Sequence, residues 1–158
     1  MKFVTDAMHG RIARYLRILG YDTFYPNDIS DSEILEIAKK ENRIIITRDV
    51  QLSERARSRN IPFILLRSVD FTRNFHEIYK KFSLNLELDS NKSRCPVCNS
   101  EITPIPKEKI KGKVPEKTYL RFEKYWICTN KKCGKIYYEG MHWVKIRKQL
   151  EKVKNYSE

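Results

Sequence analysis

Residues 30–49 read SDSEILEIAKKENRIIITRD and contain the signals of a helix followed by a buried strand. Ser30 and Glu33 fit a capping box, in which the serine hydroxyl caps the first turn and the glutamate reaches back. Apolar side chains then recur at helical spacing, as the buried face of that helix: Ile34, Leu35, Ile37 and Ala38. The run Arg43-Ile44-Ile45-Ile46-Thr47 lacks polar alternation, which predicts a central strand covered on both faces.

The sequence on both sides of this stretch repeats the alternation of strand and helix. We predict further strands at residues 2–5, 23–25 and 63–66, and further helices at residues 11–19, 52–59 and 71–82. Because the connections are short, this alternation favours an α/β fold with a parallel sheet flanked by helices. The order of the strands does not follow from the pattern.

The length of 158 residues fits one domain or two small ones, and we divide the chain into residues 1–90 and 91–158. No run of apolar residues approaches the length of a membrane span. The first residues also lack the apolar stretch of a signal peptide. We therefore expect a cytoplasmic protein without a membrane partner.

The net charge of +12 is unevenly distributed: residues 1–91 carry +2 and residues 92–158 carry +10. A basic surface of this size favours a polyanionic partner, RNA or DNA. The alternative interpretation is a solvated basic surface that has no partner.

Aspartates follow the predicted strands. Asp6 comes directly after the first strand and Asp49 after the strand at 43–47, so both are expected at the carboxyl edge of the sheet. Asp31 begins a helix whose N-terminus lies at the same edge, and Asp28 and Asp70 are in loops that can reach it. Converging carboxylates repel one another unless a divalent cation neutralises them, and their oxygens suit Mg²⁺ or Mn²⁺.

A metal held by carboxylates beside basic residues suits phosphodiester hydrolysis. Arg11, Arg14 and Arg48 are placed to hold phosphate oxygens. Simpler interpretations stay open for each acid: Asp31 can interact with its helix dipole, and Asp6 or Asp49 can cap the next helix.

Four cysteines form two close pairs, Cys95 with Cys98 and Cys128 with Cys133. Two such turns form a tetrahedral Cys₄ zinc site, and four sulfur ligands leave no open position for catalysis. A redox-active pair would explain the first two cysteines but not the second two. His142 is a spare histidine that the site does not require.

The region around the second cysteine pair is basic and aromatic. Residues 107–117 predict a mobile loop that contacts phosphates without reading sequence, and residues 143–153 predict a basic helix. The aromatic side chains pack around the metal or stack on unpaired bases. The loop lysines are Lys107, Lys109, Lys111, Lys113 and Lys117.

Residues 6–22, DAMHGRIARYLRILGYD, closely resemble the opening of the Mut-seven C-terminal RNase family. The resemblance continues through Asp31 with Ile34 and Ala38, through Thr47-Arg48-Asp49, and through the paired cysteines to the Gly-Met-His-Trp stretch, roughly residues 2–145. It implies a PIN-like domain followed by a zinc ribbon, in which acidic residues bind divalent metal and cleave RNA.

Within this resemblance, Asp6, Asp31 and Asp49 match the acids of the family pattern, and Asp28 and Asp70 are added as further metal-site candidates. His9 stands where the family pattern has leucine. We assign it no catalytic role and expect it only to begin the helix.

The resulting hypothesis is a metal-dependent ribonuclease in which residues 1–90 cut RNA and residues 91–158 hold it. tRNA, ribosomal RNA and mRNA are all compatible substrates. One alternative is a non-catalytic module that binds tRNA or ribosomal RNA. Another is a phosphotransfer protein. It is disfavoured because such a protein needs a second acid beside Asp6 near the first strand, and because Arg67 stands where it needs a lysine after a late strand.

Overall fold

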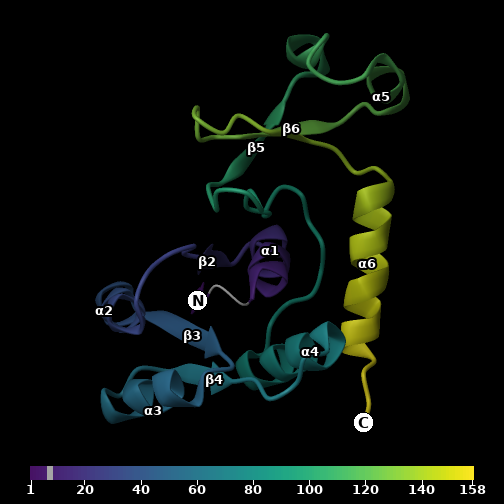
Figure 1. The fold of residues 1–158 in the computed structure, drawn as a ribbon. Coiled ribbons are helices and arrows are strands. Elements are labelled where there is room, and N and C mark those ends of the chain that lie inside the picture. Colours follow the sequence, from purple (N-terminus) through teal and green to yellow (C-terminus); the bar gives the residue numbers. More distant parts are fainter. Residues whose placement is uncertain (7–8) are drawn as a thin grey trace.

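The computed structural model describes residues 1–6 and 9–158, and its larger part is a parallel sheet between helices (Figure 1). The strand order is β2-β1-β3-β4, and all pairs are parallel. The predicted α/β class is therefore confirmed. The strands are β1 (Lys2–Thr5), β2 (Asp22–Phe24), β3 (Arg43–Thr47) and β4 (Phe63–Leu65), and the helices are α1 (Gly10–Ile18), α2 (Asp31–Glu41), α3 (Val50–Ser58) and α4 (Phe71–Phe82).

The smaller part is an antiparallel sheet in the order β5-β6-β7. We call this sheet with its two cysteine turns, residues 95–137, the zinc-ribbon module. Helix α6 follows it and runs back to α4 (Figure 1). The elements are β5 (Ile102–Ile105), the 3₁₀ helix η1 (Lys107–Ile110), α5 (Glu116–Arg121), β6 (Tyr125–Cys128), β7 (Ile136–Tyr137) and α6 (Met141–Lys154).

Both faces of the parallel sheet are covered, as the apolar run in β3 predicts. Successive strand residues point to opposite faces, so Ile45 and Ile46 enter different cores, and both are fully buried. Ile46 packs with Phe3 and with residues of α1 and α4, whereas Ile45 packs with residues of α2 and α3.

Helix α6 belongs to the core of the larger part, although it follows the zinc-ribbon module in sequence. Its buried side chains Ile146, Leu150 and Val153 share one hydrophobic cluster with Phe75 and Ile78 of α4. The chain thus returns to its first core after forming the module. The boundary at residues 90 and 91 stays a prediction.

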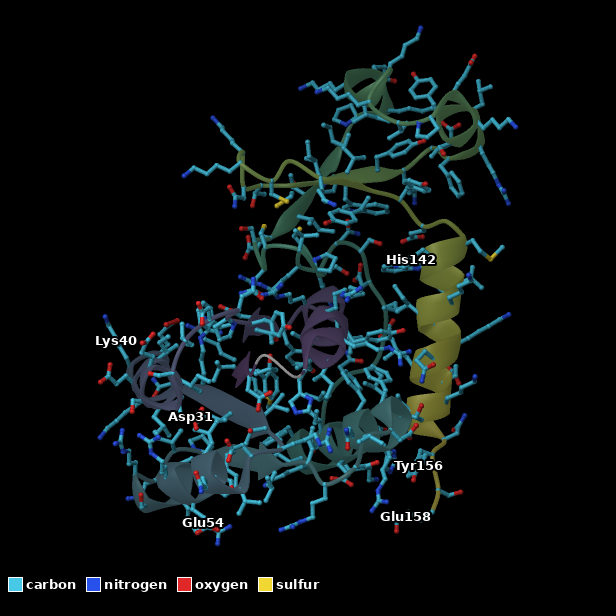
Figure 2. All side chains as sticks on the ribbon, in the orientation of Figure 1. Asp31, Lys40, Glu54, His142, Tyr156 and Glu158 are labelled. Atoms are coloured by element: carbon cyan, nitrogen blue, oxygen red, sulfur yellow. The ribbon has the colours of Figure 1, made fainter. Side chains whose placement is uncertain are left out.

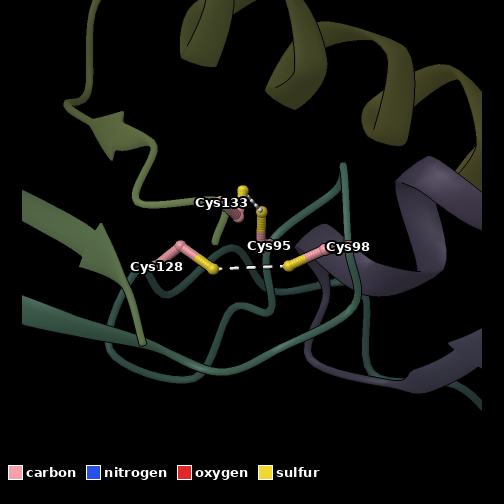
Figure 3. A group of neighbouring side chains, drawn as sticks. All are labelled: Cys95, Cys98, Cys128 and Cys133. Atoms are coloured by element: carbon pink, nitrogen blue, oxygen red, sulfur yellow. Dashed lines mark hydrogen bonds between the residues drawn. The ribbon is translucent and has the colours of Figure 1, made fainter. Parts of the chain in front are cut away.

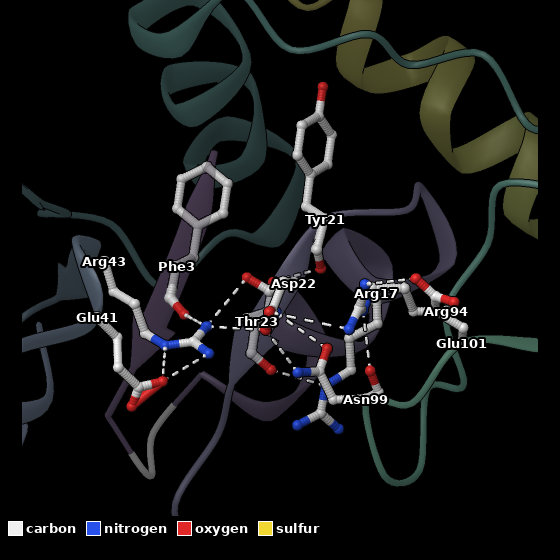
Figure 4. Close-up of polar contacts among 10 residues, drawn as sticks. All are labelled: Phe3, Arg17, Tyr21, Asp22, Thr23, Glu41, Arg43, Arg94, Asn99 and Glu101. Atoms are coloured by element: carbon white, nitrogen blue, oxygen red, sulfur yellow. Dashed lines mark hydrogen bonds and ion pairs between the residues drawn. The ribbon is translucent and has the colours of Figure 1, made fainter. Parts of the chain in front are cut away.

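The module is attached to the edge of the sheet (Figure 4). β2 is an edge strand, and side chains rather than another strand occupy its free backbone groups at Thr23. The Thr23 N–H donates to Asn99 Oδ1 at 3.0 Å, and Arg17 Nε donates to the Thr23 carbonyl at 3.0 Å. Arg17 Nη1 also donates to the carbonyl of Pro96 in the first cysteine turn, at 2.9 Å. These bonds cover a strand edge that would otherwise be open to pairing.

The end of α1 contacts the segment that leads into the module. The carbonyls of Arg17 and Ile18 accept hydrogen bonds from the Arg94 N–H and the Ser93 hydroxyl. Gly20 has φ +96°, and a Cβ there would lie 2.6 Å from the Lys92 carbonyl oxygen. Only glycine allows residue 20 to lie this close to the Lys92 backbone. The close approach lets the segment after Lys92 donate hydrogen bonds to the last carbonyls of α1.

Asp22 is the central acid of this junction. Its Oδ1 accepts from Asn99 Nδ2 at 2.7 Å and from Arg43 Nη1 at 2.9 Å, and Arg94 lies 3.8 Å from Oδ2. Burial acts to raise the pKa of Asp22, but the hydrogen bonds from Asn99 and Arg43 hold it below the ordinary value of 3.8.

One sequence-based expectation is wrong. Residues 107–117 do not form a wholly irregular loop, because they include η1 and the start of α5. Ile110 is fully buried among the lysines, and Lys107 pairs with Glu123 at 2.9 Å. Because the segment is rich in lysine, its composition gave no indication that Ile110 is buried.

Within residues 1–6 and 9–158, no helix has the length and apolar character needed to cross a membrane.

The lowered pKa of Asp22 predicts acid-dependent stability. Its ionised form stabilises the fold above pH 3.8, and this contribution is lost as pH falls through the still lower pKa of the folded state. We expect Asp22→Asn to lower the free energy of unfolding by about 1–3 kcal/mol at pH 7, with a smaller difference from the wild type near pH 3. Denaturant unfolding between pH 3 and 7 measures this difference.

The control is Glu54→Gln, because Glu54 is exposed on α3 and makes no ion pair with a described residue (Figure 2). If the difference in stability between the wild type and Asp22→Asn were equal at every pH, the assignment would be contradicted.

Candidate active site and candidate zinc centre

Aspartates line a pocket of about 500 Å³ at the carboxyl ends of β1 and β3. In the order β2-β1-β3-β4, the chain builds outward in opposite directions from β1 and β3, and ligands of such sheets bind at that reversal. The structure brings together four of the five predicted acids here, with Arg48. The pocket, which we call the aspartate pocket, is lined by Asp6, Asp28, Asp31, Asp49, Arg48, Pro26, Asn27, Ile29 and Ile34.

Thr47 holds Asp6 in place. Its buried hydroxyl donates to Asp6 Oδ2 at 2.6 Å and accepts from the Asp49 N–H at 2.9 Å. The ends of β1 and β3 are thereby linked at the pocket. Thr47 was not among the predicted site residues. The signal available was a hydroxyl residue that ends an apolar strand two positions before an acid.

Asp49 and Asp70 both cap helices. Asp49 Oδ1 accepts from the N–H groups of Gln51 and Leu52, which starts α3 at Val50, two residues before the predicted start. These bonds use Oδ1 and leave Oδ2 for a ligand. Asp70 accepts from the Arg73 N–H at 2.8 Å and caps α4, and it does not line the aspartate pocket.

Asp31 and Asp28 approach the pocket from the segment after β2. Asp31 is the first residue of α2, which Ser30 caps by accepting from the Glu33 N–H at 3.2 Å. Figure 2 shows Asp31 between α2 and α3. A carboxylate in the first turn of a helix is stabilised by the helix dipole. Asp28 is exposed in the preceding loop.

His9 lies against Asp6 behind the pocket. It occupies the N-cap position of α1, is 6% exposed, and places Nε2 3.7 Å from Asp6 Oδ1. Burial lowers the pKa of His9, Asp6 raises it and Arg48 lowers it, with a net decrease. The imidazole is therefore neutral near pH 7. The expectation that His9 begins the helix is confirmed, but its contact with Asp6 was not foreseen, and the preceding residues 7–8 lie outside the described residues.

The three predicted phosphate-binding arginines diverge. Arg48 lines the aspartate pocket, whereas Arg11 places its guanidinium 4.0 Å from the centroid of the Phe71 ring. Arg14 lines a different cavity, between α1 and the zinc-ribbon module. Among the predicted lysines, Lys107 is paired with Glu123, and the exposed ones are Lys109, Lys111 and Lys113.

The four cysteines converge in the module (Figure 3). One ligand atom from each lies within 4.8 Å of all the others, and no other His, Cys, Asp or Glu group in residues 1–6 and 9–158 is equally compact. The Sγ atoms of Cys98 and Cys128 are 3.4 Å apart, and those of Cys95 and Cys133 are 3.8 Å apart. All four are free thiols, and a compact set of four sulfurs fits tetrahedral zinc.

The thiols cannot all ionise without a cation. Burial acts to raise the pKa of Cys98, but hydrogen bonds from Ser100 lower it to about 6. Burial raises the pKa of Cys128 to about 12. A divalent metal bound by four thiolates removes this conflict. His142 is not part of the cluster.

The model of the Mut7-C RNAse domain family matches residues 1–150, which include the aspartate pocket and all four cysteines. No curated protein and no solved structure matches the chain. The match confirms the resemblance found in the sequence.

The cysteine geometry predicts one zinc per chain. We expect Cys128→Ser to reduce the zinc content well below one per chain and to lower the melting temperature, because structural zinc contributes folding free energy. Elemental analysis after dialysis and thermal unfolding measure both effects. His142→Ala is the matched control and should keep its zinc. Full zinc occupancy in Cys128→Ser would overturn this prediction.

Proposed function

This chain belongs to the Mut7-C RNAse domain family, and we propose that it is a divalent-metal-dependent ribonuclease that cuts RNA at the aspartate pocket. The observation that supports this proposal most is the meeting of four carboxylates and one guanidinium in a single pocket where the strand order reverses.

The donor set of the pocket fits Mg²⁺ or Mn²⁺. Asp6 and Asp49 come from neighbouring strand ends and offer carboxylate oxygens, which these ions prefer. Carboxylates gathered in one pocket also repel one another in the absence of a cation. A bound Mg²⁺ or Mn²⁺ would supply an activated water and neutralise charge on the phosphate.

The side chains of the chain have separable roles in this proposal. The Thr47 hydroxyl fixes the orientation of Asp6, and Asp49 holds its position by capping α3 through Oδ1 only. Arg48 reaches the pocket as an exposed guanidinium and would bind a phosphate oxygen of the RNA. His9, buried and neutral, packs behind Asp6 and excludes water from that side.

RNA binding would fall to the second half of the chain. Residues 92–158 carry a net charge of +10, and the exposed lysines of the module contact phosphates without regard to sequence. Zinc at the four cysteines would hold this surface in shape, since the cluster leaves no coordination position for substrate.

The proposal predicts cleavage that requires both metal and the pocket acids. We expect end-labelled single-stranded RNA to be cut by the zinc-loaded protein with Mn²⁺ or Mg²⁺. Asp6→Asn and Asp49→Asn should each reduce the rate at least about 100-fold, because they remove metal-ligand charge. Asparagine still caps a helix, so Asp49→Asn leaves α3 intact.

Asp70→Asn is the matched control, because it makes the same change at a capping acid outside the pocket. It should cut RNA like the wild type. RNA binding without cleavage in the wild type would instead identify a non-catalytic RNA-binding module. Equal cleavage by Asp6→Asn and the wild type would place the reaction elsewhere.

A further inference from the structure

A second cavity, of about 120 Å³, lies where α1, the zinc-ribbon module and the first turn of α6 meet. Its volume is well above the about 10–15 Å³ that admits one water molecule. We call it the junction cavity. Its walls are largely apolar, and the aromatic residues among them are Trp126, Tyr137, Tyr138 and Trp143. Walls of this kind suit a planar ring.

Trp143, which lines the junction cavity, carries a buried donor that lacks an acceptor. Trp143 Nε1 is buried and has no hydrogen-bond partner among the described residues. The other indole of the chain, that of Trp126, donates to Asn91 Oδ1 at 3.0 Å. Buried N–H groups are almost always paired, so an unpaired donor on a residue that lines a cavity is a group that a ligand with an acceptor can satisfy.

The groups around the cavity favour an anion. Arg14 lines it and is exposed, and its guanidinium makes no hydrogen bond or ion pair with a described residue. Helix α6 begins there at Gly140 without a side-chain cap and without an acid in its first turn, so its N-terminal amides and dipole attract negative charge. His142 is exposed at the same end of α6 (Figure 2). Glu139, the residue before Gly140, accepts a hydrogen bond from the Ser90 hydroxyl at 2.8 Å.

An apolar cavity with aromatic lining residues, an unpaired N–H donor on one of them and a neighbouring anion site complements the chemistry of a nucleotide. We propose that the junction cavity binds one unpaired base of a single-stranded RNA, with Trp143 Nε1–H donating to the base and Arg14 and the start of α6 binding its phosphate. This inference rests on the proposed function, since it names the form of RNA that the protein engages: single-stranded, with a base turned out of its stack.

The position of the cavity relates it to the aspartate pocket. Helix α1 begins at Gly10, four residues after Asp6, and its other end contributes Ile18 to the junction cavity. At 1.5 Å per residue the helix spans about 12 Å, which corresponds to about four stacked nucleotides at about 3.4 Å each. A base held at one end of α1 would therefore set which phosphate reaches the acids at the other end.

The test observes the two indole N–H signals by NMR of the full-length, zinc-loaded protein labelled with ¹⁵N-tryptophan. Trp126→Phe assigns the signals. Without added Mg²⁺ or Mn²⁺, titration with adenosine or uridine 5′-monophosphate should shift the Trp143 signal saturably. Ribose 5-phosphate, which has no base, should leave it in place. Arg14→Ala should weaken nucleotide binding about tenfold, whereas Lys145→Ala, an equal charge change on the exposed side of α6, should not.

Three results would overturn the proposal. The first is a Trp143 signal that no nucleotide moves, which indicates a cavity filled by water alone. The second is an equal shift with ribose 5-phosphate, which indicates a phosphate site. The third is a shift only on titration with an aromatic peptide, which indicates a protein partner. Because this assay needs no cleavage, it is independent of the nuclease test. Base binding in a protein that cuts no RNA would uphold the cavity and reject the proposed function.

A second measurement covers the effect on reaction. In a protein that cuts RNA, Trp143→Phe keeps an aromatic ring but loses the pyrrole part of the indole with its N–H donor. It should raise KM for single-stranded RNA about fivefold with little change in kcat, the opposite of the loss of kcat expected for Asp6→Asn. An unchanged KM in a folded Trp143→Phe protein would also reject the proposal.

Discussion

The candidate active site depends on the parallel pairing of β1 with β3. The register sets Thr5 opposite Ile46, so the next residue of each strand, Asp6 and Thr47, meet at the sheet edge and form their 2.6 Å hydrogen bond. Burial fixes that register. A shift by one residue would turn the side chains of Ile45 and Ile46 to the opposite faces of the sheet, and neither side chain would then lie in the core that it now fills. The position of the acids is thus a consequence of how the centre of the sheet packs.

The same domain carries the zinc-ribbon module as part of its own structure. Arg17 and Asn99 occupy the free edge of β2, and the last carbonyls of α1 accept from residues that precede Cys95. Helix α6 then returns to the first core through Ile146 and Leu150. The cysteine cluster, the end of α1 and the aspartate pocket at its beginning are therefore connected by one short helix, which agrees with a family match that extends over residues 1–150.

Features set by local chemistry were predictable from the sequence. The apolar run of β3, the Ser30 cap and the cysteine spacing each specify their structure over a few residues, and all three are present. Features that depend on distant contacts were not. The strand order, the diversion of Arg14 to the junction cavity and the burial of Ile110 within a lysine-rich segment all arise from packing between segments far apart in the chain. A position after a strand does not by itself place an acid in the pocket. Asp70 follows β4, but it caps α4 and does not line the aspartate pocket.

The most direct test of this account is anomalous X-ray scattering from crystals of the zinc-loaded protein soaked in Mn²⁺. The account predicts a zinc peak among the four cysteines and a manganese peak in the aspartate pocket, in contact with Asp6 and Asp49. A pocket that stays free of manganese at concentrations that support RNA cleavage in solution would contradict it. So would a manganese peak bound only by acids outside the pocket.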